Sequence, residues 1–377
     1  MDLRWAEVCG RRLARHGLTP AARPATPAEA AAAMCGAHAQ VLPAGEVSIG
    51  LRVPGVRHSR VQEALWSEHS LIKTYGPRGT VHLLPAADLP LWCGALSARP
   101  AAQHHPAMGL TQERTEELIA AIGMILADTE LTVDELTDAL AGQVGPWAVD
   151  PVIPAFQGMW PRWRQLTAIA AHRGVLCFGP NKGRKVTYTS PARWLPGLAP
   201  ARPAEATRWL LGRYLWSYGP ATPQHFARWL GTGSAWARSL FETSDLTDVS
   251  FEGRRAWVGR GDDEAGDPAR GVLLLPHFEA FAVGSQPREL LFPGPAWNRA
   301  LARGQAGNYP VLLVDGVVAG VWHQRKTGAR VAITVEPLRT LTAGQLRQAG
   351  EQAERIGAIL EASPTLTFGP ISVGAHA

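Results

Sequence analysis

The first candidate for a catalytic site is a short string, His38-Ala39-Gln40, which follows an alanine-rich run of helical character. Residues two apart on an extended segment point to the same side, so His38 and Gln40 could hold one water molecule between them. The carbonyl of Gln40 would orient that water, and the imidazole of His38 could accept its proton, because histidine titrates near neutral pH. The alternative is that the string is the solvent-facing polar end of the helix that begins at Thr26.

A second string, Arg78-Gly79-Thr80-Val81-His82, is a basic, glycine-containing turn that runs into an apolar strand. Arg78 and Thr80 could contact a phosphate or a sugar, because both side chains donate hydrogen bonds to such groups. His82 could line a pocket. The alternative is a structural turn followed by an edge strand, with Thr80 holding the turn and His82 satisfied locally.

Two further segments place basic side chains between predicted strands. Residues 179–185 predict a hairpin turn whose tip holds Lys182, Arg184 and Lys185, a good site for backbone phosphates. A solvated hairpin tip with no ligand is the alternative. Residues 322–328 predict a second exposed basic turn, and we expect it to contact a nucleic-acid groove through Gln324, Arg325 and Lys326.

The elements around these residues repeat one pattern. Three helix starts carry a threonine N-cap, at Thr26-Pro27-Ala28-Glu29, at Thr132-Val133-Asp134-Glu135 and at Thr222-Pro223-Gln224-His225, the last with His225 in place of the acid. Hairpins are predicted over residues 73–85, 175–189 and 246–258. Helices followed by a two-stranded hairpin are typical of a winged helix.

The remainder of the chain predicts a strand-rich tail. Stretches rich in proline and alanine near residues 98–108 and 189–203 are candidate linkers. The fold class is therefore α+β and mainly helical. The predicted tail strands cover residues 272–275, 310–314, 317–322 and 330–335, before a closing amphipathic helix over about 343–361. The predicted domains are residues 1–100, 101–200, 201–260 and 261–377.

Composition limits the classes of function. The chain has 377 residues, 46% of them hydrophobic, and a formal net charge of +5, which fits a polyanionic partner, although an arginine-rich composition alone gives the same balance. The four cysteines form no C-x-x-C pair, which argues against a zinc ribbon and predicts buried, reduced thiols. No apolar run has membrane-spanning length and no signal segment is present, so we expect a cytoplasmic protein.

Tryptophan is more frequent than tyrosine, with 14 residues against 5. Stretches that predict helices hold Trp160, Trp163, Trp209, Trp216 and Trp229. We expect these side chains to lie in the core and not to act as platforms for base stacking.

In this order, the strings resemble the winged-helix DNA glycosylases of the AlkZ/YcaQ type, which excise alkylated purines and unhook interstrand crosslinks. That family carries Gln-x-Gln or Gln-x-Asp where this chain has His38-Ala39-Gln40. The His-x-Gln form is similar to variants of AlkZ-like proteins associated with genotoxin-producing actinomycetes. The resemblance extends through residues 47–52, 78–82 and 313–320.

A further stretch, Leu275–Phe281 together with Arg288, resembles the family's Leu-Pro-x-Phe-Asp-x-Tyr…Arg pattern. Glu279 replaces the usual Asp, and Phe281 replaces the usual Tyr. We interpret the stretch as mainly structural and expect at most a buried pair between Glu279 and Arg288.

The resemblance implies three tandem winged helices with a small C-terminal β element, wrapped as a C around duplex DNA. It implies hydrolysis of the N-glycosidic bond of N7-alkylguanine, or of a bulky or crosslinked adduct, by a monofunctional enzyme without metal or cofactor. His38 and Gln40 would place the water. The DNA would be held by Arg78, Thr80, His82, Lys182, Arg184, Lys185, Gln324, Arg325 and Lys326. We expect a nucleoid-associated monomer, with double-stranded DNA carrying alkylated guanine as its partner.

The departure at His38 motivates a biological hypothesis, self-resistance to a genotoxic natural product. Two other functions stay open at this point. One is a non-catalytic winged-helix regulator that binds DNA, and the other is a resistance protein that sequesters the drug itself. All three need a basic cleft with a polar pocket, so the sequence does not separate them.

Overall fold

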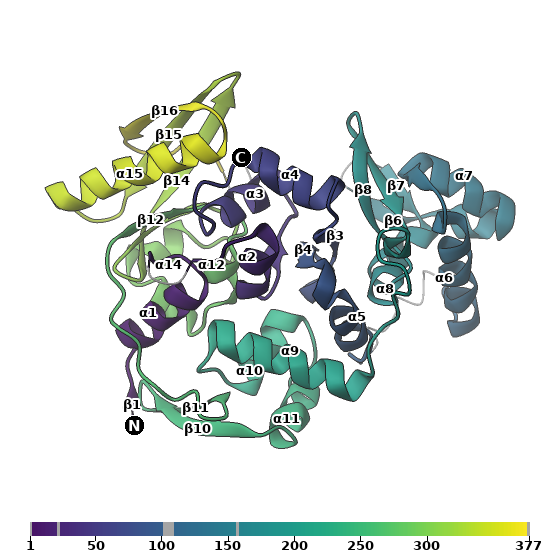
Figure 1. Ribbon diagram of the computed structural model, residues 1–377, viewed down its shortest axis with the longest axis horizontal. Coiled ribbons are helices and arrows are strands. Elements are labelled where there is room, and N and C mark those ends of the chain that lie inside the picture. The colour runs from purple at the N-terminus through teal and green to yellow at the C-terminus, as the bar shows by residue number, and fades with distance from the viewer. Residues whose placement is uncertain (1, 21–22, 101–108, 156–157, 375–377) are drawn as a thin grey trace. The chain divides into compact units, whose positions relative to one another are not determined.

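The computed structural model describes residues 2–20, 23–100, 109–155 and 158–374 (Figure 1). The chain divides into two compact units, each treated separately below. The first comprises Met1–Ala64, Leu211–Leu230 and Ser234–Ala377, and the second comprises Leu65–Leu210 and Gly231–Gly233. Helices and strands both contribute to each unit, which confirms the α+β class. Residues 101–108, most of the first predicted linker, lie outside the described residues.

The first unit is built on a five-stranded sheet. Neighbouring strands are antiparallel except β15 and β16, which are parallel and therefore need a crossover connection. Helix α15 supplies it, starting at a capping box formed by Thr342 and Gln345, and packs against β12, β15 and β16 (Figure 1). In sheet order the strands are β12 (Val272–Leu275), β13 (Val311–Val314), β14 (Val317–Thr327), β15 (Arg330–Pro337) and β16 (Ser363–Phe368), and α15 spans Ala343–Ile359.

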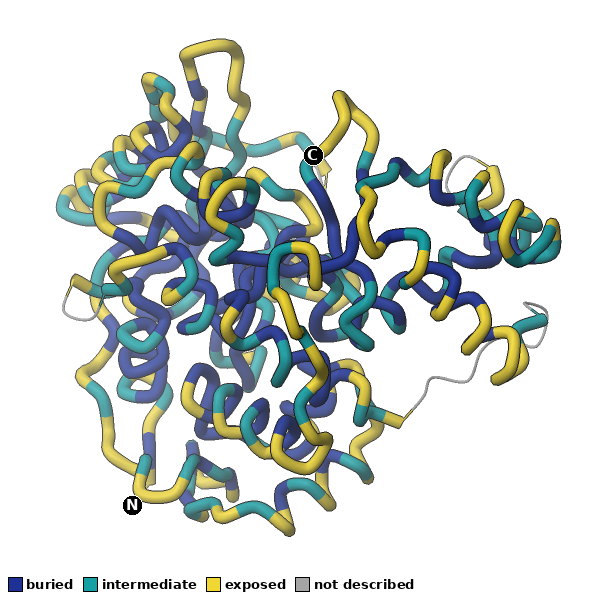
Figure 2. Tube along the Cα trace, turned by 45° about the vertical axis from the view of Figure 1, so that its right-hand side comes forward, coloured by how far each residue is buried: buried dark blue, intermediate teal, exposed yellow. Residues whose placement is uncertain are grey.

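The core of this unit lies between the sheet and its helices. The edge strand β12 and its neighbour β13 are continuous apolar runs, and the indole N–H of Trp322 donates to the carbonyl of Leu275 at 2.8 Å. Interior segments are buried, whereas hairpin tips and outer helix faces are exposed (Figure 2). The predicted tail strands and closing helix are confirmed, but β14 extends five residues beyond the predicted strand end at residue 322.

The N-terminal part of the first unit is helical. Thr26 caps α2 as predicted, accepting a hydrogen bond from the backbone N–H of Glu29 at 3.2 Å. The elements are β1 (Asp2–Leu3), α1 (Trp5–Arg15), α2 (Pro27–Ala33), β2 (Ala37–His38), α3 (Leu42–Gly50) and α4 (His58–Trp66), of which the last two residues belong to the second unit.

The middle of the chain completes the first unit. The hairpin predicted over 246–258 is confirmed, and β1 pairs with its first strand in parallel. Helix α9 contributes residues 211–218 here and its earlier residues to the second unit. The elements are α9 (Pro203–Tyr218), α10 (Pro223–Leu230), α11 (Ser234–Glu242), β10 (Leu246–Phe251), β11 (Arg254–Gly259), α12 (Ala280–Gly284), α13 (Arg288–Leu291) and α14 (Pro295–Arg299).

The second unit alternates helices with hairpins. The hairpins predicted over 73–85 and 175–189 are confirmed, as is the capping box of Thr132 and Glu135 at the start of α7. A three-stranded sheet has the order β5-β9-β8. The elements are β3 (Leu71–Tyr75), β4 (Val81–Pro85), α5 (Leu89–Ser97), α6 (Gln112–Leu126), β5 (Glu130–Thr132), α7 (Val133–Gln143), β6 (Pro151–Ala155), β7 (Gly158–Pro161), α8 (Thr167–His172), β8 (Cys177–Lys182) and β9 (Lys185–Thr189).

The tryptophan prediction is only partly right. Trp163 and Trp229 are buried, as expected. Trp160 lies on strand β7 and not on a helix, is 45% exposed, and carries the guanidinium of Arg164 over its ring at 3.9 Å. Trp216 is also 36% exposed. Tryptophan therefore forms part of the surface as well as the core.

Two other predictions concern the whole chain. The four cysteines, Cys9, Cys35, Cys93 and Cys177, are all buried free thiols, as expected. Among the described residues, no helix has both the length and the apolarity needed to cross a membrane.

Candidate functional site

The segment that carries His38 starts from the C-terminal end of α2. The carbonyls of residues 32, 33 and 34 accept hydrogen bonds from Arg213 Nη2, Ser217 Oγ and Tyr218 OH at 2.7, 3.0 and 2.8 Å. The last carbonyls of a helix have no partner within the helix. Side chains of α9 therefore donate hydrogen bonds to three consecutive carbonyls, and they fix the point from which the chain leaves α2.

The chain then reverses through two residues with positive φ, Cys35 at 54° and Gly36 at 93°. The N–H of Gly36 reaches back to the carbonyl of Ala31 at 2.9 Å, which closes the helix end. His38 lies on the short strand β2, and Gln40 lies just before α3. The string is thus not the polar end of the helix. His38 is 7% exposed, whereas Gln40 is exposed.

Helix α3 packs closely on this string. A Cβ atom added to Gly45 would lie 2.8 Å from the carbonyl oxygen of His38 and 3.5 Å from Cβ of Ala39. The first distance is shorter than a normal contact, so only glycine lets α3 approach the backbone this closely. Gly45 therefore fixes the position of the His38 backbone.

The next residue on α3, Glu46, is a buried carboxylate that the sequence analysis missed. It is 4% exposed and accepts a hydrogen bond from the side chain of Gln62 on α4. The signal for it is that Glu46 is the one charged residue in residues 44–50, since a charged residue is rarely buried without a partner.

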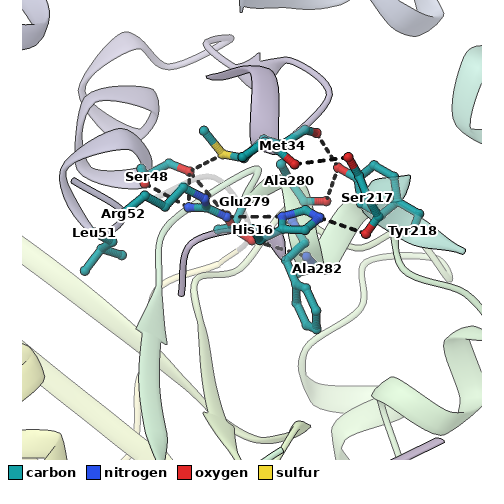
Figure 3. A network of polar contacts seen from close by, with 12 residues as sticks. His16, Met34, Ser48, Leu51, Arg52, Ser217, Tyr218, Glu279, Ala280 and Ala282 are labelled. Carbon is teal, nitrogen blue, oxygen red and sulfur yellow. Dashed lines mark hydrogen bonds and ion pairs between the residues drawn. The ribbon is translucent and has the colours of Figure 1, made fainter. Parts of the chain in front are cut away.

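A buried polar network supports α3 from the other side (Figure 3). Arg52 Nη2 lies 2.5 Å from Glu279 Oε1, and both side chains are completely buried. Ser48 Oγ donates to the same carboxylate at 3.2 Å. The other oxygen of Glu279 accepts from the N–H groups of Phe281 and Ala282, which caps α12.

The predicted pair between Glu279 and Arg288 is therefore wrong. The guanidinium of Arg288 donates to the carbonyls of Val283 and Gly304, at 3.0 and 3.1 Å. The carboxylate of Glu279 instead caps the start of its own helix and pairs with Arg52, which lies two residues beyond the end of α3.

His16 completes this network as a neutral group. Burial and the nearby Arg52 hold the pKa of His16 well below its usual value. Its Nε2 lies 3.2 Å from the carbonyl of Ser217, and its Nδ1 lies 3.5 Å from Arg52 Nη2. One assignment satisfies both contacts, because Nε2–H donates to the carbonyl while Nδ1 accepts from the guanidinium.

In the second unit, the turn between β3 and β4 presents Arg78. Arg78 has a φ of 59° and is partly exposed. The hydroxyl of Thr80 donates to the carbonyl of Pro77 at 3.0 Å, and His82 Nδ1 lies 2.8 Å from the carbonyl of Thr80. His82 is 1% exposed, and burial together with Arg78 lowers its pKa to about 3. Thr80 and a neutral His82 thus hold the turn that carries Arg78.

The hairpin of β8 and β9 carries the predicted basic tip. Lys182, Arg184 and Lys185 are all exposed, but both lysines contact acids at the start of α7. Lys182 Nζ lies 3.5 Å from Glu135, and Lys185 Nζ lies 2.8 Å from Asp134. Within the described part of the chain, Arg184 has no ion-pair partner. The charge available at this tip is therefore chiefly that of Arg184.

The second basic segment is not the turn that the sequence predicted. Gln324, Arg325 and Lys326 lie on strand β14, because the register of β14 with β15 places the two-residue turn at Gly328-Ala329. Lys326 is exposed, and its ammonium group donates to the carbonyl of Leu360 at 2.9 Å. Side chains alternate along a strand, so Arg325 lies on the opposite face of the sheet, where it is also exposed.

The described residues contain no group of three or more histidine, cysteine or acidic side chains placed to hold a metal ion. The polar side chains of this string and of the adjacent α3 include the imidazole of His38, the amide of Gln40 and the carboxylate of Glu46. Such groups can orient a water molecule and accept or release its proton, and they can stabilise charge on a bound substrate.

Comparison with known proteins gives consistent matches. The sequence matches a family model described as DNA glycosylase AlkZ-like over residues 31–359. It is similar to an interstrand DNA cross-link repair glycosylase of Streptomyces sahachiroi, with 31% identity over 338 residues, which cover 85% of this chain and 88% of that protein. The fold is similar to the solved structure of the Streptomyces sahachiroi DNA glycosylase AlkZ, with a TM-score of 0.82, 27% identity, and coverage of 98% of this chain and 100% of that one.

Proposed function

This chain belongs to the AlkZ-like DNA glycosylase family, and from that premise we propose that it hydrolyses the N-glycosidic bond of N7-alkylated guanine in duplex DNA. An N7-alkylated guanine already carries a positive charge, so the base leaves without a strong general acid. The enzyme has to bind the nucleotide, stabilise an oxocarbenium-like sugar and place a water molecule near C1′.

His38 and Gln40 supply the water-placing groups in this proposal. The observation that carries it is the fixation of the His38 segment, by α9 at residues 32–34 and by Gly45 of α3. The exposed amide of Gln40 orients the water, and the imidazole of His38 accepts its proton. A hydrolysis of this kind needs no lysine nucleophile, so the proposed enzyme is monofunctional.

The remaining predicted residues bind DNA or support residues that bind it in this proposal. Arg78, Arg184 and Arg325 are cations that can reach phosphates, and Lys182 and Lys185 can join them by exchanging their surface ion pairs. Thr80 and His82 act by holding the turn of Arg78. Gln324 and Lys326 belong to the same strand as Arg325 and support its placement on the DNA.

We extend the proposal to the architecture. The second unit contains α6, β5, α7, the short β6–β7 hairpin, α8 and the β8–β9 hairpin in that order, and the three helices followed by a hairpin support a winged helix. Three such modules, with the domain limits 1–100, 101–200 and 201–260 and a C-terminal β element over 261–377, would curve as a C around the duplex. The protein would act as a monomer.

The biological substrate is proposed to be a bulky adduct or an interstrand crosslink of a genotoxic natural product. The relative from Streptomyces sahachiroi is named for interstrand cross-link repair, which supports this extension. His38 stands where the family has Gln, and this departure is the reason to propose self-resistance to such a compound.

Base release from defined duplexes tests the proposal. One duplex carries N7-methylguanine, and others carry bulky N7-guanine adducts of intercalating antibiotics. Abasic products are read as alkali-sensitive strand breaks. We expect release by the wild type and none by the His38→Ala, Gln40→Ala double variant. DNA binding without release from any adduct would support the non-catalytic regulator instead.

A further inference from the structure

A cavity lies within the first unit, among the start of α10, the β10–β11 hairpin and the residues around α13. It has a volume of about 600 Å³, which is within the range of sites that hold small organic ligands. Apolar atoms of Phe251, Pro287 and Leu290 form part of its wall. None of the residues assigned to base release or to DNA contact above lines it.

The charged side chains around this cavity are mostly basic. Arg228 and Arg254 line it, are exposed, and have no ion-pair partner in the part of the chain that the structure describes. Arg255 also lines it, but is paired with Asp248. Two acids face the same space. Glu252 is compensated by Arg4 at 3.7 Å and by the N–H of Trp5, which leaves Glu289 as the one uncompensated acid among the described lining residues.

A buried cation lies immediately behind the wall. Arg12 is 1% exposed and donates to the carbonyls of Gly219, Pro220 and Gln286, at 3.3, 3.1 and 2.7 Å. Its guanidinium lies over the ring of Phe251, 5.8 Å from the centroid. Carbonyl groups satisfy its hydrogen bonds but do not cancel its charge. Arg12, Arg228 and Arg254 carry three positive charges, and Glu289 carries one negative charge. The cavity is therefore surrounded by an excess of two positive charges.

Two neutral donors complete the lining. His225 Nδ1 accepts the N–H of Thr222 at 3.3 Å, so the ring hydrogen lies on Nε2, for which the described residues supply no acceptor. Burial, Arg12 and Arg228 lower the pKa of His225 to about 4, which keeps the ring neutral at physiological pH. Gln286 is 5% exposed, and its side-chain amide bonds to none of the described residues.

We propose that this cavity binds a phosphate monoester with an apolar or flat body, such as a nucleoside monophosphate. Arginine side chains bind phosphate oxygens in a bidentate manner, and an excess of two charges matches a dianion better than a carboxylate. The apolar wall receives the body of the ligand, and His225 and Gln286 donate to its polar atoms. The phosphate can belong to a free nucleotide or to the 5′ end of a DNA strand.

Calorimetric titration of the full chain tests this inference at low ionic strength. We expect adenosine 5′-monophosphate to bind, and adenosine to bind at least about tenfold more weakly because it lacks the phosphate. The Arg228→Gln, Arg254→Gln double variant should lose about tenfold or more in affinity for the nucleotide. Both side chains are exposed, so the substitutions leave the core intact.

The matched control is Arg238→Gln, an exposed arginine of α11 that does not line the cavity, and its affinity should stay within about twofold of the wild type. Comparing 5′-phosphorylated with 5′-hydroxyl duplexes decides whether the bound phosphate is that of a DNA end or of a free nucleotide. Absence of nucleotide binding by the wild type, or unchanged binding in the double variant, would overturn the inference. The base-release assay measures the proposed glycosylase activity separately. The proposed nucleotide binding and the proposed base release can therefore be contradicted independently of each other.

Discussion

Arg52 lies 2.5 Å from Glu279, although 227 residues separate them in the sequence and both side chains are completely buried. Arg52 follows the end of α3, and Ser48 on that helix donates to the same carboxylate, so the network joins α3 to the start of α12 (Figure 3). Gly45 of the same helix lies close to the backbone of His38. Taking two charges out of water is costly, and the pair is stable only while both charges and their hydrogen bonds are present. The position of His38 is therefore coupled to an ion pair formed by a distant part of the chain.

Replacing one member of this pair should destabilise the protein strongly. Glu279→Gln leaves the Arg52 guanidinium buried without a counter-charge, and we expect a loss of about 3 kcal/mol in the free energy of unfolding. Urea unfolding measures the loss. Glu351→Gln is the control, because that side chain is exposed and pairs with Arg347 only across one helical turn. Equal free energies of unfolding for the two variants would show that the fold does not depend on the buried ion pair.

Gln40→Ala should slow base release strongly while preserving DNA binding. The amide orients the proposed water but is exposed, so the fold does not depend on it. We expect the single-turnover rate to fall by about 100-fold, with the affinity for undamaged duplex unchanged. Gln112→Ala, at the exposed start of α6, is the control. Undiminished catalysis by Gln40→Ala would remove this string from the mechanism.

Gly45→Ala tests the close approach of α3 to the His38 backbone. The added Cβ would lie 2.8 Å from the carbonyl of His38, so α3 or β2 must shift. We expect the free energy of unfolding to fall by about 1–3 kcal/mol and the base-release rate to fall with it. Gly142→Ala on α7 is the matched control, because nothing lies within 4 Å of its added Cβ. That substitution should stabilise the protein by about 0.5–1 kcal/mol, through the higher helix propensity of alanine.

Arg184→Ala should weaken DNA binding in a salt-dependent way. Each cation that neutralises a phosphate contributes about one to the slope of log affinity against log salt concentration, so the slope should fall by about one. Lys185→Ala should change it less, because Asp134 already compensates that lysine. Fluorescence anisotropy between about 50 and 200 mM salt measures both slopes. A larger effect for Lys185 would mean that the ion pair with Asp134 opens on DNA.

His82 should make stability fall in mild acid. Its pKa is about 3 in the folded chain, whereas a solvent-exposed histidine has a pKa of about 6.5, so the unfolded chain binds the proton first as the pH falls. The stabilisation is complete above about pH 6.5 and is lost progressively down to about pH 3. From pH 7 to pH 5 this histidine should contribute a loss of about 2 kcal/mol. Urea unfolding at the two pH values should show a smaller difference for His82→Gln, and an identical difference would contradict the assignment.

Local features of the fold were predictable from the sequence, because turn and capping residues act within a few positions. The hairpins over 73–85, 175–189 and 246–258 and the caps at Thr26 and Thr132 belong to this class. The exact strand end was not predictable. The basic residues 324–326 read as a turn, but cross-strand pairing with β15 keeps them in β14.

The place of the His38 string just after the first capped helix was predictable from the sequence, but its burial was not. The His38 string does lie beyond the helix, yet the sequence gives no sign that His38 is buried while Gln40 is exposed. The partner of Glu279 was missed because contacts across 227 residues depend on tertiary packing, and spacing along the chain does not encode them. Trp160 was misplaced because its apolar surroundings fit a strand and a helix equally well.

The first unit takes its residues from both ends of the chain, whereas most of the second unit is one continuous stretch. During synthesis on the ribosome, residues 65–210 can therefore collapse as soon as they emerge, but the helices that hold His38 must wait for Arg213, Tyr218 and finally Glu279. A nascent or truncated chain that stops before residue 279 would expose an unpaired Arg52 and a loose His38 strand. Competence for catalysis would then arise late in translation, after most of the protein has been made.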